Sequence, residues 1–141
     1  MAREKQYAAL PYRLDKSGRP EVLLITSRET RRWVVPKGWP MTDKLGHEAA
    51  AVEAYEEAGV RGIISEVAIG SFRYDKRLVD DDDIPCRVEV YRLMVEEELD
   101  RWPEMEERKR RWFRPKKAAK LVDEADLAKL ILSEEAYKAA S

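Results

Sequence analysis

Three glutamates, Glu53, Glu56 and Glu57, have the types and spacing that could support chemistry. They lie in an alanine-rich segment of strong helix formers. At about 100° per residue, positions i, i+3 and i+4 share one narrow arc of a helix, so the carboxylates are predicted to project on one side. Like charges this close repel one another unless a cation lies among them. Oxygen ligands without Cys or His suit Mg²⁺ or Mn²⁺, so the pattern predicts a divalent-metal site.

The helix that carries these glutamates is predicted to begin at residues 47–48 and to end at Gly59, which can take the left-handed conformation that closes a helix. Ala51, Tyr55 and Ala58 point the opposite way and are predicted to pack on a sheet.

The segment from Gly38 to Val60 resembles the Nudix box, Gly-x5-Glu-x7-Arg-Glu-U-x-Glu-Glu-x-Gly-U with U apolar, which marks hydrolases of nucleoside diphosphates linked to another moiety. Two positions depart from the motif: Lys44 stands in place of its first glutamate, and Val52 in place of its arginine. The matching positions are Gly38, Glu53, Ala54, Glu56, Glu57, Gly59 and Val60. The simpler alternative is a solvated acidic helix.

The resemblance implies that metal ions, usually Mg²⁺, are held by the three box glutamates. A backbone carbonyl of Lys37 or Gly38 is a possible further ligand. The metal ligands expected on this basis are Glu53, Glu56, Glu57 and Gly38.

Glu53 and Glu57 are the expected catalytic residues, with Glu53 as the first candidate for the general base. A carboxylate with negative neighbours can have a raised pKa suited to accepting a proton. The family places its base variably, so Glu104 and Glu107 in a later acidic loop are alternatives, although each is also typical of a solvated loop residue.

Phosphate-binding side chains are expected in the loops beside the box, where arginine suits bidentate contact. Two or three of the following should be used: Arg28, Arg31, Arg32, Lys37, Lys76 and Arg77. Trp39, just after the box glycine, either offers a stacking face to a base or packs under the loop.

The two departures from the motif concern the support of the site. The box arginine of the family commonly pairs with carboxylates around it, and an arginine at position 52 would lie i to i+4 from Glu56. Loss of such a supporting partner typically costs ~10–100-fold in metal affinity or activity and does not abolish the site. We therefore expect an active, metal-dependent enzyme whose loop is held by different contacts.

The length of 141 residues predicts one domain covering residues 1–141. Lys and Arg number 27 against 28 Asp and Glu, so no overall basic field indicates nucleic-acid binding. No apolar run approaches the ~20 residues needed to span a bilayer, and the first residues lack a signal-peptide core. We expect a cytoplasmic monomer or homodimer that binds a phosphorylated small molecule and no membrane.

Cysteine and histidine each occur once. Cys86 excludes an intramolecular disulfide and is typical of a small buried apolar residue. His47 alone cannot supply Ser-His-Asp, Cys-His or multi-histidine metal sites. Chemistry in this chain must therefore use carboxylates, Lys, Arg, Tyr and metal.

The order of predicted elements indicates an α+β fold in which helices sandwich a mixed β-sheet. It resembles the Nudix fold over nearly the whole chain. The strand run from Val22 to Ile25 should be buried on both faces. Residues 80–83 should form a solvated hairpin tip. Asp123 or Asp126 could cap the last helix. Predicted strands cover 6–14, 21–27, 33–35, 63–73, 72–79, 86–95 and 109–114, and helices follow at 116–122 and 127–137.

Two further pieces, 33–38 and 102–113, resemble the branch of the family that contains diphosphoinositol polyphosphate and diadenosine polyphosphate hydrolases. The resemblance implies a metal-dependent pyrophosphohydrolase that cleaves a phosphoanhydride bond in such a nucleoside or inositol polyphosphate. The alternatives are an ADP-ribose, nucleotide-sugar or NTP pyrophosphatase, and a non-catalytic binding module with the Nudix fold.

Overall fold

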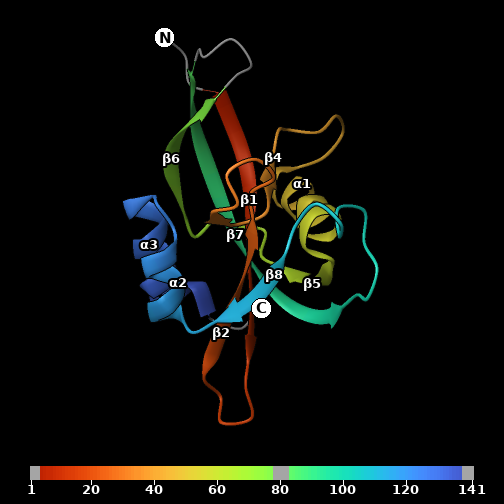
Figure 1. Cartoon of the computed structure of the whole chain (residues 1–141), viewed down its shortest axis with the longest axis vertical. Coiled ribbons are helices and arrows are strands. Elements are labelled where there is room, and N and C mark those ends of the chain that lie inside the picture. The colour runs from red at the N-terminus through yellow and green to blue at the C-terminus, as the bar shows by residue number, and fades with distance from the viewer. Residues whose placement is uncertain (1–3, 78–82, 138–141) are drawn as a thin grey trace.

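The computed structural model of the chain describes residues 4–77 and 83–137, without the side chain of Arg77. Figure 1 shows its sheet with helices on both sides. The strands are β1 (Glu4–Leu14), β2 (Pro20–Thr26), β3 (Trp33–Val34), β4 (Lys37–Gly38), β5 (Val60–Ile64), β6 (Gly70–Arg77), β7 (Asp83–Glu98) and β8 (Arg110–Phe113). The helices are α1 (Gly46–Glu53), η1 (Ala54–Ala58), α2 (Pro115–Leu121), α3 (Ala125–Leu132) and η2 (Glu134–Tyr137).

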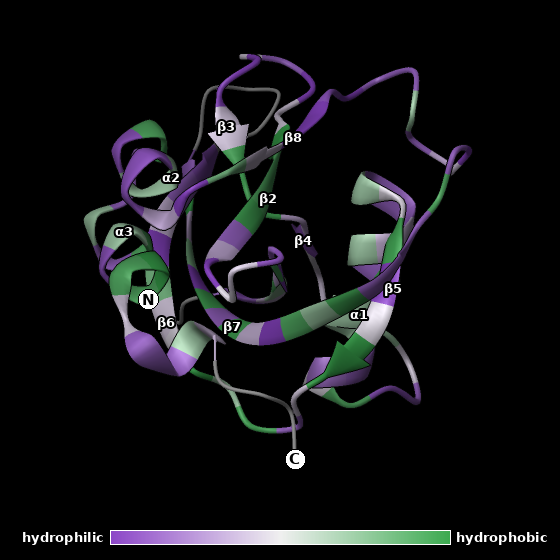
Figure 2. Cartoon of the chain, turned by 90° about the horizontal axis from the view of Figure 1, so that it is seen from below, coloured by the Kyte–Doolittle hydropathy of each residue, from purple (hydrophilic) through white to green (hydrophobic). Residues whose placement is uncertain are grey.

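The sheet is mixed, as predicted. Its main path runs β3-β2-β1-β7-β5, with β4 pairing with β1, β6 with β7 and β8 with β2. The β1–β7 pair is parallel, while the other pairs are antiparallel. Figure 2 shows α2 and α3 on one side of the sheet and α1 on the other. The predicted α+β sandwich is therefore confirmed.

Strand β2 supplies both halves of the core. Leu24 packs in the cluster that also contains Leu127 and Ile131 of α3, while Leu23 and Ile25 pack in the cluster under α1 and η1. Successive residues of a strand point to opposite faces, so burial of the whole run from Val22 to Ile25 requires a layer on each side. The prediction for this run is confirmed.

The helix that carries the glutamates has an α-helical part followed by a π-helical turn. Here α1 passes directly into η1, a π-helical turn, and we call residues 46–58 the box helix. Gly59 follows with φ of 66°, which confirms the predicted left-handed cap. In a π-turn the backbone bonds run i to i+5, so the 100° spacing does not hold there. Ala51 of α1 and Tyr55 of η1 are only half-buried, contrary to the prediction, while Ala58 is buried.

Three further predictions about the elements were wrong or lie outside the described residues. The predicted strand 63–73 is two strands, β5 and β6, with no strand at 65–69. Neither aspartate caps α3: its N-cap is Glu124, which makes no side-chain cap bond, and η2 is a separate 3-10 turn. The predicted acidic hairpin tip, 80–83, lies outside the described residues except for Asp83, where β7 begins.

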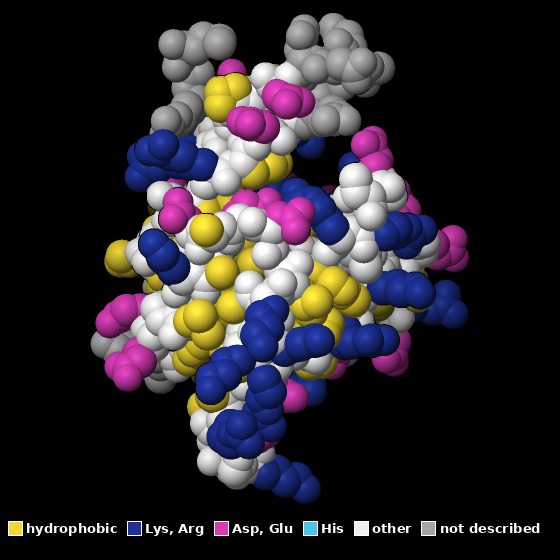
Figure 3. All heavy atoms as spheres, turned by 60° about the vertical axis from the view of Figure 1, so that its left-hand side comes forward, with side chains coloured by type: hydrophobic (Ala, Val, Ile, Leu, Met, Phe, Trp, Pro, Cys, Tyr) yellow, Lys and Arg dark blue, Asp and Glu magenta, His cyan; other side chains and the backbone are white. Residues whose placement is uncertain are grey.

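Charge is unevenly spread over the surface. Figure 3 shows Lys and Arg side chains gathered over the lower part of one face. Helix α2 carries three lysines, Lys116, Lys117 and Lys120.

The helices of the described residues are too short or too polar for any of them to span a bilayer.

Candidate active site

A cavity of about 560 Å³ opens beside the box helix and contains most of the predicted site residues. Its walls come from β4, the box helix, the end of β6, the turn after β2 and the loop 99–109, which we call the acidic loop. The lining residues are Gln6, Ser27, Arg28, Glu29, Thr30, Arg32, Val34, Lys37, Gly38, Trp39, Glu53, Glu57, Tyr74, Asp75, Lys76, Glu104 and Arg108.

Gly38 lies directly against the Glu53 carboxylate. A Cβ atom on Gly38 would lie 1.4 Å from Glu53 Oε2, so any larger residue would displace that carboxylate. The glycine is therefore required by close approach and not by a left-handed backbone. The contact places the backbone of β4 beside the predicted general base.

Glu57 is the buried carboxylate of the site, with 8% of its surface exposed. Its Oε1 accepts a hydrogen bond from the backbone N–H of Lys37 over 3.2 Å. Its Oε2 lies 3.6 Å from Nη2 of Arg108. One oxygen is thus held by β4 and the other faces the acidic loop.

Burial and mutual repulsion shift the pKa of both carboxylates upward. Burial raises the pKa of Glu53 to about 8, and the charges of Glu57, Glu56 and Glu104 add to the shift. Burial raises the pKa of Glu57 to about 7, against the opposing effect of Arg108 and Lys37. Two desolvated carboxylates at one cavity wall form a site that a divalent cation would stabilise.

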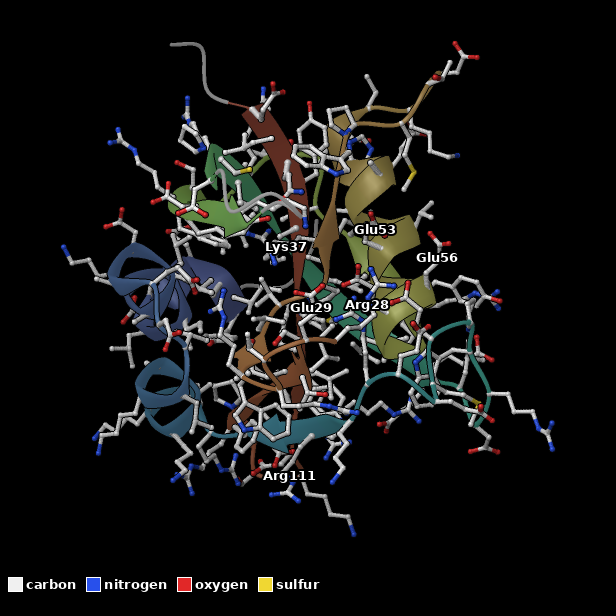
Figure 4. All side chains as sticks on the ribbon, turned by 45° about the horizontal axis from the view of Figure 1, so that its top comes forward. Arg28, Glu29, Lys37, Glu53, Glu56 and Arg111 are labelled. Atoms are coloured by element: carbon white, nitrogen blue, oxygen red, sulfur yellow. The ribbon has the colours of Figure 1, made fainter. Side chains whose placement is uncertain are left out.

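The chemistry of the donors fits Mg²⁺ or Mn²⁺, since the acidic groups at this wall are oxygen donors only. Within residues 4–77 and 83–137, no three acidic side chains already stand in an arrangement that could hold an ion. Glu56 does not line the cavity with Glu53 and Glu57. Figure 4 shows it on the outer side of the helix, away from Lys37. The ligand set of Glu53, Glu56, Glu57 and Gly38 stays a prediction.

Lys37 is a half-buried cation of the cavity. Burial lowers the pKa of its ammonium to about 8, with Glu57 and Glu124 opposing that shift. Its Nζ lies 4.7 Å from the centroid of the Tyr74 ring, at a cation–π distance. The Tyr74 hydroxyl donates to Gln6 Oε1 over 2.5 Å, which fixes the ring below the ammonium.

The other predicted phosphate ligands differ in their partners. Arg28 Nη1 lies 3.4 Å from Glu107 Oε1 at the exposed rim, and Arg32 Nη1 lies 3.0 Å from Glu124 Oε2. Lys76 also lines the cavity. Figure 4 shows Arg28 and Lys37 near Glu53 around the same space.

The structure also places the remaining residues that were predicted to lie at this site. Arg31 is absent from the cavity lining, and the side chain of Arg77 lies outside the described residues. Trp39 is 39% exposed at the cavity, so it does not pack under the loop. Glu107 is an exposed ion-pair partner, whereas Glu104 lines the cavity and is not a solvated loop acid.

Sequence reasoning missed Arg108, Gln6 and Tyr74. Arg108 contacts both Glu57 and Glu104, and its i, i+4 spacing from Glu104 was the available signal. No local pattern marks Gln6 or Tyr74, because their hydrogen bond joins residues far apart in the chain.

Comparison with known proteins agrees with this geometry. Residues 4–133 match the family model of the NUDIX domain. Nudix hydrolase 12, mitochondrial, of Arabidopsis thaliana is 38% identical over 127 residues, which cover 79% of this chain and 63% of that protein. Diphosphoinositol polyphosphate phosphohydrolase 3-alpha of Homo sapiens is 35% identical over 122 residues, which cover 84% of this chain and 69% of that protein.

Solved structures show the same fold. The binary complex of the C. elegans Ap4A hydrolase has a TM-score of 0.68 at 22% identity, covering 91% of this chain and 92% of its own. The E. coli dihydroneopterin triphosphate pyrophosphohydrolase has a TM-score of 0.69 at 14% identity, covering 93% and 95%. This chain spans less than two thirds of the length of the Arabidopsis relatives it matches, 63% and 64% for two of them. The family-model match over residues 4–133 shows that the chain belongs to the Nudix family.

Proposed function

We propose that this chain is a metal-dependent pyrophosphohydrolase that cleaves a phosphoanhydride bond in a nucleoside or inositol polyphosphate. The proposal rests on the meeting of half-buried Glu53, buried Glu57 and Lys37 in one cavity. A site for a polyphosphate needs cations for its oxygens and carboxylates for the metal that shares them.

Each side chain has a role in this scheme. Glu57 and Glu53 would hold Mg²⁺ or Mn²⁺, which would neutralise phosphate charge and lower the pKa of water. Lys37 and Lys76 contact phosphate oxygens. As the water oxygen bonds to phosphorus, the bridging P–O bond breaks and the bridging oxygen leaves with the departing phosphate, while Glu53 accepts the water proton.

The cavity also favours a substrate with an aromatic or other flat group beside its phosphates. Trp39 is exposed at the cavity, so its ring is free to stack on a base. Two relatives point to substrates with several linked phosphates: one is named a diphosphoinositol polyphosphate phosphohydrolase, and a structural neighbour is an Ap4A hydrolase. Diadenosine polyphosphates and diphosphoinositol polyphosphates are therefore the first substrates to test.

The test is hydrolysis by the purified chain with Mg²⁺ or Mn²⁺. The panel contains dinucleoside polyphosphates, inositol pyrophosphates, ADP-ribose, nucleotide sugars and nucleoside triphosphates, and released phosphate or nucleotide is measured. We expect turnover of at least one of the first two classes. Glu57→Gln should lower it by at least about 100-fold, since loss of a mere supporting partner costs ~10–100-fold.

The matched control is Glu106→Gln, which removes a carboxylate from an exposed position of the acidic loop that does not line the cavity. Its rate should equal that of the wild type. Equal rates in the wild type and Glu57→Gln would contradict the proposal. Ligand binding without turnover would instead support a non-catalytic binding module.

A further inference from the structure

The box helix has no arginine of its own to hold its glutamates, because position 52 is valine. Arg108, from the acidic loop, brings a guanidinium to the same wall. Its side chain is 9% exposed, and its Nη2 lies 3.6 Å from Glu57 Oε2. A guanidinium that is this buried is held in one place by its partners.

The other nitrogens of Arg108 are also engaged. Nε donates to Glu104 Oε1 over 2.8 Å, and Nη1 donates to the carbonyl oxygen of Thr26 over 3.2 Å. The planar guanidinium therefore joins the box helix, the acidic loop and the end of β2 in a fixed fork that an ammonium group could not reproduce.

The backbone on either side of Arg108 is anchored independently. Thr26 N donates to the Lys109 carbonyl over 3.0 Å, and Lys109 N donates to Thr26 Oγ1 over 2.9 Å. The middle of the loop is held as well, since Glu104 N donates to the Glu56 carbonyl over 3.0 Å. The position of the guanidinium is thus set by main-chain bonds and not by the carboxylates alone.

The acidic loop and the first residue of β8 together bind the C-terminal end of the box helix. Trp102 Nε1 of the loop donates to the Glu57 carbonyl over 3.1 Å, and Arg110 Nη1 of β8 donates to the carbonyls of Ala58 and Gly59 over 3.0 and 3.2 Å. Helix ends leave such carbonyls without intrahelical partners, and here Trp102 and Arg110 satisfy them. Both the backbone and the carboxylate of Glu57 are therefore held from the acidic loop.

We propose that Arg108 is a positioning residue for Glu57: it orients this carboxylate towards the cavity from the acidic loop, in place of an arginine on the helix. The effect of Arg108 on catalysis rests on the proposed function. The effect of Arg108 on metal binding can be measured without turnover. Glu104 acts as the partner that keeps Arg108 in place.

The sign of a metal-affinity change tests the inference. A positioning residue holds a ligand ready, so Arg108→Gln should weaken Mn²⁺ binding by ~10–100-fold. A cation that merely occupies the site would compete with the ion, so its loss would strengthen Mn²⁺ binding. Stronger or unchanged binding in Arg108→Gln would overturn the proposal.

Mn²⁺ affinity is measured on the substrate-free chain by titration with electron paramagnetic resonance detection of free Mn²⁺. Glu104→Gln, which keeps the shape of the partner, should weaken binding in the same direction but less. It also keeps the test decisive if Arg108→Gln does not fold, because unchanged or stronger Mn²⁺ binding in Glu104→Gln would then overturn the proposal. Arg101→Gln is the matched control, since Arg101 is exposed in the same loop, and its affinity should equal that of the wild type.

Kinetics give a second measurement where turnover is found. Arg108→Gln should lower kcat more than it raises KM, because Arg108 orients a catalytic carboxylate and contacts no substrate. An increase in KM alone would contradict the positioning role. If the wild type binds Mn²⁺ and hydrolyses nothing, the proposed function fails while the metal-affinity comparison still decides the role of Arg108.

Discussion

The backbone amide of Lys37 donates a hydrogen bond to Oε1 of Glu57 over 3.2 Å, and this bond joins β4 to the box helix. The bond uses the main chain, so it persists when the Lys37 side chain is changed. The same residue sends its ammonium to the Tyr74 ring inside the cavity. Support of the carboxylate and the proposed contact with phosphate therefore come from separable parts of one residue.

Lys37→Met should consequently lower kcat/KM without weakening metal binding. A hydrogen bond to a charged group contributes about 1.5–3 kcal/mol, which corresponds to a loss of about 10- to 100-fold. Steady-state kinetics on the best substrate, with Mn²⁺ titration beside them, check both parts. Lys44→Met, at an exposed position outside the cavity lining, is the control. An unchanged kcat/KM in Lys37→Met would show that the ammonium does not contact substrate.

The metal-free chain should lose stability as pH rises from about 4.5 towards 8. The pKa values of Glu53 and Glu57 are raised from 4.5 to about 8 and about 7, so in this window the folded state binds more protons than the unfolded chain. Stability then falls with rising pH. The pKa of Lys37 is lowered from 10.5 to about 8, so its titration affects stability mainly above pH 8.

Thermal unfolding at pH 5 and pH 8, with EDTA or with Mg²⁺, measures this effect. Mg²⁺ binds the ionised carboxylates of the folded state, so it should raise Tm more at pH 8 than at pH 5. Glu53→Gln should reduce the pH-dependent loss in EDTA. A loss of the same size in Glu53→Gln and the wild type would assign it to other groups.

The sequence predicted those parts of the site that depend on neighbours along the chain. Gly38, Glu53 and Glu57 belong to one motif, and the left-handed cap at Gly59 follows from residue type alone. The π-turn at 54–58 was not predictable, because its residues have the same helical propensities in either geometry. Within that turn Glu57 lines the cavity and Glu56 does not.

Contacts between distant segments account for the rest. Arg108 reaches Glu57 across 51 positions of sequence, and its neighbours Lys109 and Arg110 carry the same charge, so composition does not single it out. The division of 63–73 into β5 and β6 depends on pairing with distant β7: β5 ends with Ile64 opposite Leu93, and β6 begins with Gly70 opposite Val90. Strand propensity describes a pleated, half-buried surface and does not locate such a break.

Tyr74→Phe should destabilise the chain by about 1–3 kcal/mol, because it leaves the oxygen of buried Gln6 without its donor. The phenyl ring still lies below Lys37, so kcat/KM should change little. Urea unfolding measures the first effect and kinetics the second. Tyr55→Phe is the control: Tyr55 is only half-buried, and the change should stay within about 0.5 kcal/mol. Equal effects of the two substitutions would remove the role assigned to the Gln6 bond.

Gly59→Ala should destabilise the chain more than Gly18→Ala. Both glycines have positive φ, 66° and 84°, where a Cβ atom costs roughly 1–2 kcal/mol. A Cβ on Gly18 would meet nothing within 4 Å, whereas one on Gly59 would lie 2.5 Å from Trp102 Cδ2 and 2.7 Å from Arg110 Nη1. These two side chains hold the end of the box helix, so Gly59→Ala adds their displacement to the conformational cost.

Urea unfolding of the two variants isolates the cost of displacing Trp102 and Arg110, since the conformational cost is common to both variants. We expect Gly59→Ala to lose at least about 1 kcal/mol more than Gly18→Ala, in the range of overpacking in a filled core. Mn²⁺ affinity should also fall in Gly59→Ala alone, because Trp102 bonds the carbonyl of Glu57. Losses of the same size in the two variants would mean that Trp102 and Arg110 move aside at little cost and do not brace the box helix.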